Sequence, residues 1–248
     1  MRTVLLWAVL MLAVAAEQPV APVPSGLDHS PYQELLQRYV NERGLIDYAG
    51  LAGNADDLTQ LDAYLQAMAQ PGQPATGAER VAALINAYNA ITLRAVITLG
   101  VEAGESFWSH DPFDDRIYTI GGEAVSLDAI EHQALRPEAG YRVHAALVCA
   151  AMSCPPLWRQ AFTASNLDAA LNERFAVWLA RQDLNHFDHS TNRLELSKIF
   201  SWFKADFVAA GGVTAVVARH APPSHRAWLE TASPKTRYLP YDKRLNAQ

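Results

Sequence analysis

The chain has 248 residues, and half of them are hydrophobic, which is enough for one domain with a sizeable core. Its net charge is −6, with acids and bases interspersed and no basic block. This balance excludes nucleic acid and anionic membranes as main partners. The sequence contains no P-loop, dinucleotide fingerprint or Gly-x-Ser-x-Gly elbow, so we expect neither a cofactor nor a serine hydrolase of the common type.

The first residues have the pattern of a signal peptide. Arg2 gives a positive start, an apolar run covers 4–14, and Ala13–Ala15 has the small residues that a signal peptidase recognises. We therefore assign 1–16 to a cleaved signal peptide and expect a periplasmic or secreted protein, of bacterial origin. The alternative is an uncleaved anchor, but the run is shorter than the about 20 residues that span a bilayer. No transmembrane segment is expected after cleavage.

Prolines are frequent in the next segment, 17–31, which we interpret as an extended linker before a single globular domain over 32–248. Helices are predicted at Tyr32–Asn41 and Leu58–Met68, because apolar residues recur there at helical spacing. A third helix is predicted from Thr76 or Gly77 to about Leu99. It is apolar on almost every side, so it should be buried on every side.

That buried helix carries two asparagines, Asn86 and Asn89. A buried amide without a partner costs about 1–3 kcal/mol. Each asparagine therefore either braces a neighbouring loop, which is the commoner use of buried amides, or lines a site.

The rest of the chain mixes short strands with helices. Four strands are predicted, at Arg116–Ile120, Glu123–Val125, Arg142–Cys149 and Arg193–Leu196. The first two form a hairpin around a Gly-Gly turn, and the third is buried and carries His144. Helices are expected from Ser165 through Leu179 and after Ile199. These elements predict an α+β fold, a mostly helical single domain with a small antiparallel sheet.

A polar stripe follows the hairpin, on a helix that Ser126 can cap and that we expect to end at Pro137. Asp128, His132 and Arg136 recur at every fourth residue and share one face, with Glu131 beside them. The stripe is either a solvated row of ion pairs or a histidine oriented by a carboxylate at the edge of a site.

Cys149 and Cys154 are the two cysteines of the chain, and Pro155 and Pro156 stiffen the loop that holds the second. An oxidising compartment favours a disulfide between them. The alternatives are a reactive thiol and a metal site with one or two histidines. The metal site has little support, because there is no second cysteine pair and no His-x-x-x-His.

Several ordered segments together resemble one family, the domain of unknown function 547. They are Ile85–Ala90, Ser126–His132, Arg142–His144 with Cys149, Ser153–Pro156, Leu196–Phe200 with Trp202 and Asp206–Phe207, and Tyr238–Asp242. The resemblance covers roughly 31–246, but Lys243 stands where the family usually has tryptophan. No reaction is attached to the family. The resemblance implies a set of candidate positions: Asn86, Asn89, Glu131, His132, His144, Cys149 and Cys154.

A buried helix followed by a histidine-bearing strand is also the order seen in papain-like and transglutaminase-like folds. A remote relationship to those folds is therefore a further hypothesis. Their catalytic cysteine begins the helix, whereas the matching stretch here offers Asn86 and Asn89. Any thiol chemistry would then come from Cys149 or Cys154.

The first functional hypothesis is a thiol-dependent hydrolase or acyl transferase acting on an unknown small or peptide-like substrate. Cys154 is the better-placed nucleophile, His144 or His132 the base, and Glu131 or Asp128 the group that orients it. Asn86 or Asn89 would donate to an oxyanion.

The second hypothesis is a non-catalytic binding or structural domain in which Cys149 and Cys154 form a disulfide. Under both hypotheses the partner is a small molecule or a peptide. The sequence alone leaves this choice open.

Overall fold

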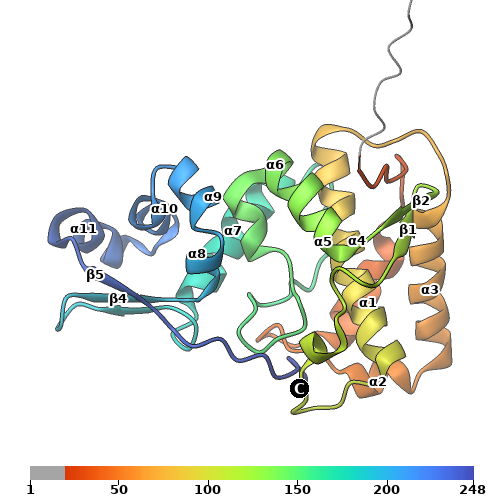
Figure 1. The fold of residues 1–248 in the computed structure, drawn as a ribbon, viewed down its shortest axis with the longest axis horizontal. Coiled ribbons are helices and arrows are strands. Elements are labelled where there is room, and N and C mark those ends of the chain that lie inside the picture. The colour runs from red at the N-terminus through yellow and green to blue at the C-terminus, as the bar shows by residue number, and fades with distance from the viewer. Residues whose placement is uncertain (1–19) are drawn as a thin grey trace, which may run out of the picture.

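A computed structural model describes residues 20–248; the predicted signal peptide at 1–16 lies outside this range. The first half of this range is built on α1 (Ser30–Tyr39), α2 (Tyr48–Ala52), α3 (Ala55–Ala69) and the central α4 (Gly77–Leu99). After η1 (Phe107–His110), the hairpin strands β1 (Tyr118–Ile120) and β2 (Glu123–Val125) lead into α5 (Leu127–Ala129). These elements pack together on one side of the molecule (Figure 1).

The second half begins with a run of short helical turns: the π-helix η2 (Ile130–Leu135), α6 (Arg136–Ala139) and the 3-10 helix η3 (Gly140–Ala145). The long α7 (Leu167–Ala180) follows. Then come β3 (His186–Asp188), β4 (Arg193–Leu196), α8 (Ile199–Trp202), α9 (Lys204–Ala209), α10 (Val213–His220), α11 (Pro223–Ala232) and β5 (Lys235–Tyr238). The strands and α11 form the far end of the molecule (Figure 1).

Helix α4 is the centre of the first core, as its all-round apolar sequence predicts. It contacts α2 and α3 on one side and η2, α6 and α7 on the other. Among the described residues it alone is long and apolar enough to cross a membrane, and 83% of that window is buried inside the fold. Here it serves as a core helix.

Two small sheets accompany the helices. The predicted hairpin is confirmed, with Tyr118 opposite Val125 in an antiparallel pair. In the second sheet, β3 and β4 are antiparallel but β4 and β5 are parallel. The fold is therefore mostly helical with small sheets, as an α+β class requires, although one sheet is mixed rather than purely antiparallel.

The strand predicted at 142–149 is wrong. His144 lies in the 3-10 helix η3, and the chain beyond it is irregular. A short apolar run does not distinguish a strand from other buried structure, and here the buried backbone is paired by a side chain. Asn89 accepts from the N–H of Val148 and donates to the carbonyl of Ala146. Without a histidine-bearing strand, the papain-like relationship is not supported.

The helix after the hairpin also differs in detail. Ser126 caps it, accepting from the N–H of Ala129 at 3.1 Å. Pro137, however, lies inside α6 rather than at the end of the helix. It is the second residue of α6, which continues directly from the π-helix.

The described part of the predicted linker, 20–31, is packed against the domain. Ala21 and Val23 are buried, and the buried Arg80 donates to the carbonyls of Val20 and Ala21. An arginine in the core needs such acceptors, which ties this segment to α4.

The buried residues form two clusters. One surrounds α4, and the other lies among α7, β4, α8, α9 and α10, where Trp178 stacks on Phe200 at 4.8 Å. Tyr241 packs against both. The chain then returns to the first half, where Ala247 pairs with Ile46, and Leu245 pairs with Ala151 of the second half.

Candidate functional site

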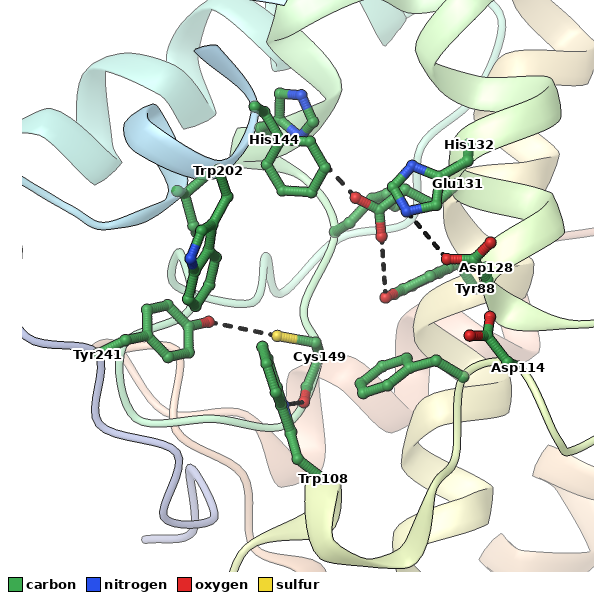
Figure 2. A pocket seen from close by; sticks show the side chains of 14 residues that line it. Tyr88, Trp108, Asp114, Asp128, Glu131, His132, His144, Cys149, Trp202 and Tyr241 are labelled. Atoms are coloured by element: carbon green, nitrogen blue, oxygen red, sulfur yellow. Dashed lines mark hydrogen bonds and ion pairs between the residues drawn. The ribbon is translucent and has the colours of Figure 1, made fainter.

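A cavity of about 280 Å³ lies where the two clusters meet. Residues from η1, η2, η3, α4, α8 and the C-terminal segment surround it (Figure 2). The lining residues are Tyr88, Trp108, Phe113, Asp114, Asp128, Glu131, His132, His144, Leu147, Cys149, Ile199, Trp202, Phe203 and Tyr241. Apolar and aromatic walls with a few polar groups are typical of small-ligand sites.

Glu131 is the most perturbed carboxyl of the cavity. It extends from η2 and accepts from the Tyr88 hydroxyl at 3.3 Å. Burial raises its pKa to about 7, and this outweighs the opposite effects of Tyr88 and Arg136. A carboxyl with a pKa near neutrality can both take and return a proton.

His144 lies beside Glu131 in a fixed orientation. Its Nε2 bonds to Asp206 Oδ2 at 2.8 Å, and its Nδ1 lies 4.0 Å from Glu131 Oε1. Burial lowers the pKa of His144 to about 4. The neutral ring must donate from Nε2 to the carboxylate, so its lone pair at Nδ1 faces Glu131.

Asp206 on α9 does not make His144 cationic, because burial outweighs its effect on the pKa of the histidine and Arg136 also binds the carboxylate. The guanidinium binds both carboxylate oxygens, at 2.8 Å each. This bidentate pairing lowers the pKa of Asp206 to about 2. Asp206 therefore positions His144 rather than charging it.

The predicted stripe on one face is confirmed. His132 Nε2 lies 2.9 Å from Asp128 Oδ1, and its Nδ1 lies 2.6 Å from Arg136 Nη1. Arginine has no acceptor, so Nδ1 must accept and Nε2 must donate to Asp128. The surrounding π-helix is the kind of irregularity that is frequent at functional sites. It brings both Glu131 and His132 to the cavity wall.

Cys149 lies at the cavity wall across from Glu131 (Figure 2), and Cys154 lies directly beside Cys149. Their sulfurs are 2.8 Å apart, and both cysteines are free thiols. Cys149 lines the cavity, whereas Cys154 is buried behind it and does not. The Tyr241 hydroxyl lies 3.3 Å from each sulfur.

Backbone contacts hold the loop that carries both cysteines. The indole of Trp108 donates to the carbonyl of Cys149 at 3.1 Å. Met152 and Ser153 donate their N–H groups to the carbonyls of Arg244 and Asp242, at 2.8 and 3.1 Å. The C-terminal segment therefore fixes the loop from outside.

Aromatic side chains close this side of the cavity. Trp108 packs against Trp202 and Tyr241, with ring centroids 5.8 and 5.5 Å away. The ammonium of Lys243 lies 4.4 Å from the Trp108 ring centroid. Lys243 thus keeps a contact with this wall through a cation–π interaction, at the position where the resemblance leads us to expect tryptophan.

Comparison with known proteins identifies the region that forms most of this site. Residues 73–179 match a family described as "Protein of unknown function, DUF547". This region is a DUF547 domain. No curated protein and no solved structure matches the chain.

The DUF547 region supplies both cysteines, Glu131, His132 and His144, but not the whole cavity. Trp202, Phe203 and Tyr241 lie C-terminal to the matched residues. Asp206, which orients His144, also lies beyond them. The site thus requires chain outside the DUF547 match.

The structure brings together four of the seven predicted site residues in the cavity, Glu131, His132, His144 and Cys149. The other three, Asn86, Asn89 and Cys154, do not line it. Asn86 pairs with the backbone N–H and carbonyl of Phe162, and Asn89 with the backbone of 146–148. Both amides are bracing groups, which was one of the two expectations.

Cys154 was the expected nucleophile, but Cys149 and not Cys154 lines the cavity. Sequence reasoning missed Tyr88, Trp108, Asp206 and Tyr241. Three of these four, all except Trp108, lie in the segments that carry the family resemblance, which was the available signal. Among residues 20–248, no group of three or more His, Cys, Asp and Glu side chains is placed to hold a metal ion.

Proposed function

We propose that this protein is a thiol-dependent hydrolase or acyl transferase with Cys149 as nucleophile. The observation that carries the proposal is the cavity itself. It joins the Cys149 thiol with a carboxyl, Glu131, whose pKa is about 7. A thiol and a proton-transfer group facing the same small cavity are the minimum for covalent acyl transfer.

The roles follow from the contacts. Glu131 takes the proton of the Cys149 thiol, and the thiolate attacks the acyl carbon. The leaving group departs with a proton returned by Glu131, and water or an acceptor nucleophile then releases the acyl group. His144, neutral and held by Asp206, keeps its lone pair toward Glu131 and so supports the protonated state of that carboxyl.

The oxyanion donor is the Tyr241 hydroxyl, which lies 3.3 Å from the Cys149 sulfur. A fixed donor next to the nucleophile can stabilise charge on the acyl oxygen. The amides of Asn86 and Asn89, expected in this role, already donate to backbone carbonyls.

The substrate is a small or peptide-like acyl compound, because a cavity of about 280 Å³ holds only a few residues' worth of atoms. The aromatic wall of Trp108, Trp202 and Tyr241 suits a flat or apolar acyl group. We also propose that the protein works in the periplasm or outside the cell, on the support of the N-terminal sequence pattern alone.

An activated ester tests the proposal. The reduced protein, incubated with a p-nitrophenyl ester and quenched in acid, should carry one acyl group that peptide mass spectrometry maps to Cys149. Cys149→Ser should abolish this thioester, and Cys154→Ser, the matched control, should keep it. Glu131→Gln should slow acylation and remove its dependence on a group titrating near pH 7. Acylation of Cys154, or none in wild type across a panel of esters and amides, would overturn the assignment.

The alternative is a non-catalytic binding domain with a structural disulfide. The 2.8 Å separation of the two sulfurs favours it as the second candidate. A domain of that kind would hold a ligand in the cavity without an acyl intermediate, so the same ester experiment separates the two functions.

A further inference from the structure

The two cysteines differ in access although their sulfurs nearly touch. Cys149 faces the cavity, where a ligand can reach it, and Cys154 is 4% exposed behind it. They are five positions apart in sequence, and 2.8 Å separates their sulfurs. A disulfide bond is about 2.0 Å long, so a small movement joins them. One accessible thiol backed by one buried thiol is the arrangement in which the second can displace a group bound to the first.

The surroundings of Cys154 stabilise a thiolate. Its sulfur accepts from the N–H groups of Cys149 and Ala151, at 3.2 and 3.4 Å, and the Tyr241 hydroxyl lies 3.3 Å from it. Burial raises the pKa of the Cys154 thiol, but these donors and the Cys149 thiol together lower it below its usual value. The hydrogen bond to Cys154, followed by burial, raises the pKa of Cys149.

The loop between the sulfurs is held in this geometry. Ala150 adopts a left-handed conformation with φ of +60°, which is unfavourable for a residue with a Cβ atom. It is fully buried, and its carbonyl accepts from the N–H of Asn246. The strain is retained where the turn presents the N–H of Ala151 to the Cys154 sulfur. The pair is therefore preorganised rather than brought together by chance in a mobile loop.

We propose that Cys149 and Cys154 form a redox-active pair that exchanges with small organic disulfides entering the cavity. Cys149 attacks one sulfur of R–S–S–R as its proton passes to the leaving sulfur, forming a mixed disulfide and releasing the first RSH. The Cys154 thiolate then attacks the Cys149 sulfur, closes the protein disulfide and expels the second RS⁻. The two protons of the protein thiols end on the two RSH products, so the protein is oxidised and the small disulfide is reduced.

The exchange needs only that Cys149 is reachable and that Cys154 lies behind it, so it does not depend on acyl transfer. Its consequence for that reaction does rest on the proposed function. Closing the disulfide consumes the Cys149 thiol, so the oxidised protein cannot form an acyl-enzyme. Reduction of the disulfide restores the Cys149 thiol and with it the ability to form an acyl-enzyme.

The test equilibrates the reduced protein with glutathione disulfide, blocks free thiols with an alkylating agent and measures intact mass and peptide maps. Wild type should lose the mass of two hydrogens without retaining glutathione, and excess dithiol should reverse this. Cys154→Ser should accumulate a glutathione mixed disulfide on Cys149, because its resolving thiol is missing. Cys149→Ser should take up little glutathione, because Cys154 does not face the cavity.

Three outcomes overturn the proposal: wild type that remains a dithiol, wild type that accumulates the mixed disulfide as Cys154→Ser does, or glutathione on Cys154 as readily as on Cys149. The first two outcomes are measured on the wild-type protein, so misfolding of a variant does not affect them. The ester assay on the reduced protein scores the proposed function separately. Disulfide exchange without acylation would support the redox pair and contradict the proposed acyl-transfer function.

Discussion

Glu131 and His144 hold one proton between them, and folding changes which side chain carries it. Near pH 5.5 an ordinary glutamate is ionised and an ordinary histidine is protonated. In the fold, burial raises the pKa of Glu131 to about 7 and lowers that of His144 to about 4, so the proton belongs to Glu131. The site thus contains a neutral acid beside a neutral base, and the two ions an unfolded chain would have are absent.

This shift of the proton from His144 to Glu131 on folding predicts how the stability of Glu131→Gln compares with that of wild type as pH changes. The folded pKa of Glu131 is raised from 4.5, so its contribution to stability is fully present below pH 4.5 and is lost as pH rises through 7. Relative to wild type, Glu131→Gln should therefore gain on the order of 3 kcal/mol in unfolding free energy between pH 4.5 and pH 7. Denaturant titrations at several pH values measure it.

The matched control is Glu230→Gln, which changes an exposed glutamate of α11. Its unfolding free energy should follow wild type at every pH. Parallel curves for Glu131→Gln and wild type would show that Glu131 ionises normally in the fold.

Individual elements show where sequence periodicity succeeds and where it fails. The all-round apolar pattern correctly predicted α4 as a buried helix, because a helix that is apolar on every side is stable in water only when every side is covered. The hairpin and the Ser126 cap were also predictable, since turn and cap residues act locally. The segment at 142–149 was not, because the side chain that pairs its backbone, Asn89, lies on another element.

Asn89 and Asn86 provide a matched pair of substitutions on one helix. Asn89→Ala leaves the Ala146 carbonyl and the Val148 N–H buried without partners, which should cost on the order of 3 kcal/mol of unfolding free energy. Asn86→Ala orphans two backbone groups of Phe162 and should cost about as much. Both losses are measured by denaturant unfolding.

The two variants should differ at the site. Asn89 anchors the segment that leads directly into Cys149, so Asn89→Ala should change the alkylation rate of that thiol under native conditions. Asn86 anchors a loop outside the cavity lining, and Asn86→Ala should leave the rate near wild type. Equal effects of both variants on Cys149 would contradict the bracing role assigned to Asn89.

At the scale of the whole molecule, the cavity exists because the C-terminal segment returns to the first half. Tyr241 reaches both sulfurs, and residues 242–247 pair with the cysteine loop and with Ile46 (Figure 1). Sequence patterns gave the candidates His132, His144 and Cys149, since reactive side chains can be found by type. They could not give Asp206 or Tyr241 a role, because those roles depend on contacts between positions 62 to 92 residues apart.

The central claim is that Cys149 and Glu131, on separate segments, act on each other across one cavity. Alkylation of Cys149 by iodoacetamide, followed against pH in wild type and in Glu131→Gln, tests it most directly. The hydrogen bond to Cys154 and burial raise the pKa of the Cys149 thiol most, and the Glu131 carboxylate adds to this effect. Glu131→Gln should therefore alkylate more slowly near neutral pH, where Glu131 accepts the thiol proton, and the alkaline part of its profile, where free thiolate reacts, should move to lower pH. Superimposable alkylation profiles would show that the two groups do not interact, and the proposed site would lose its basis.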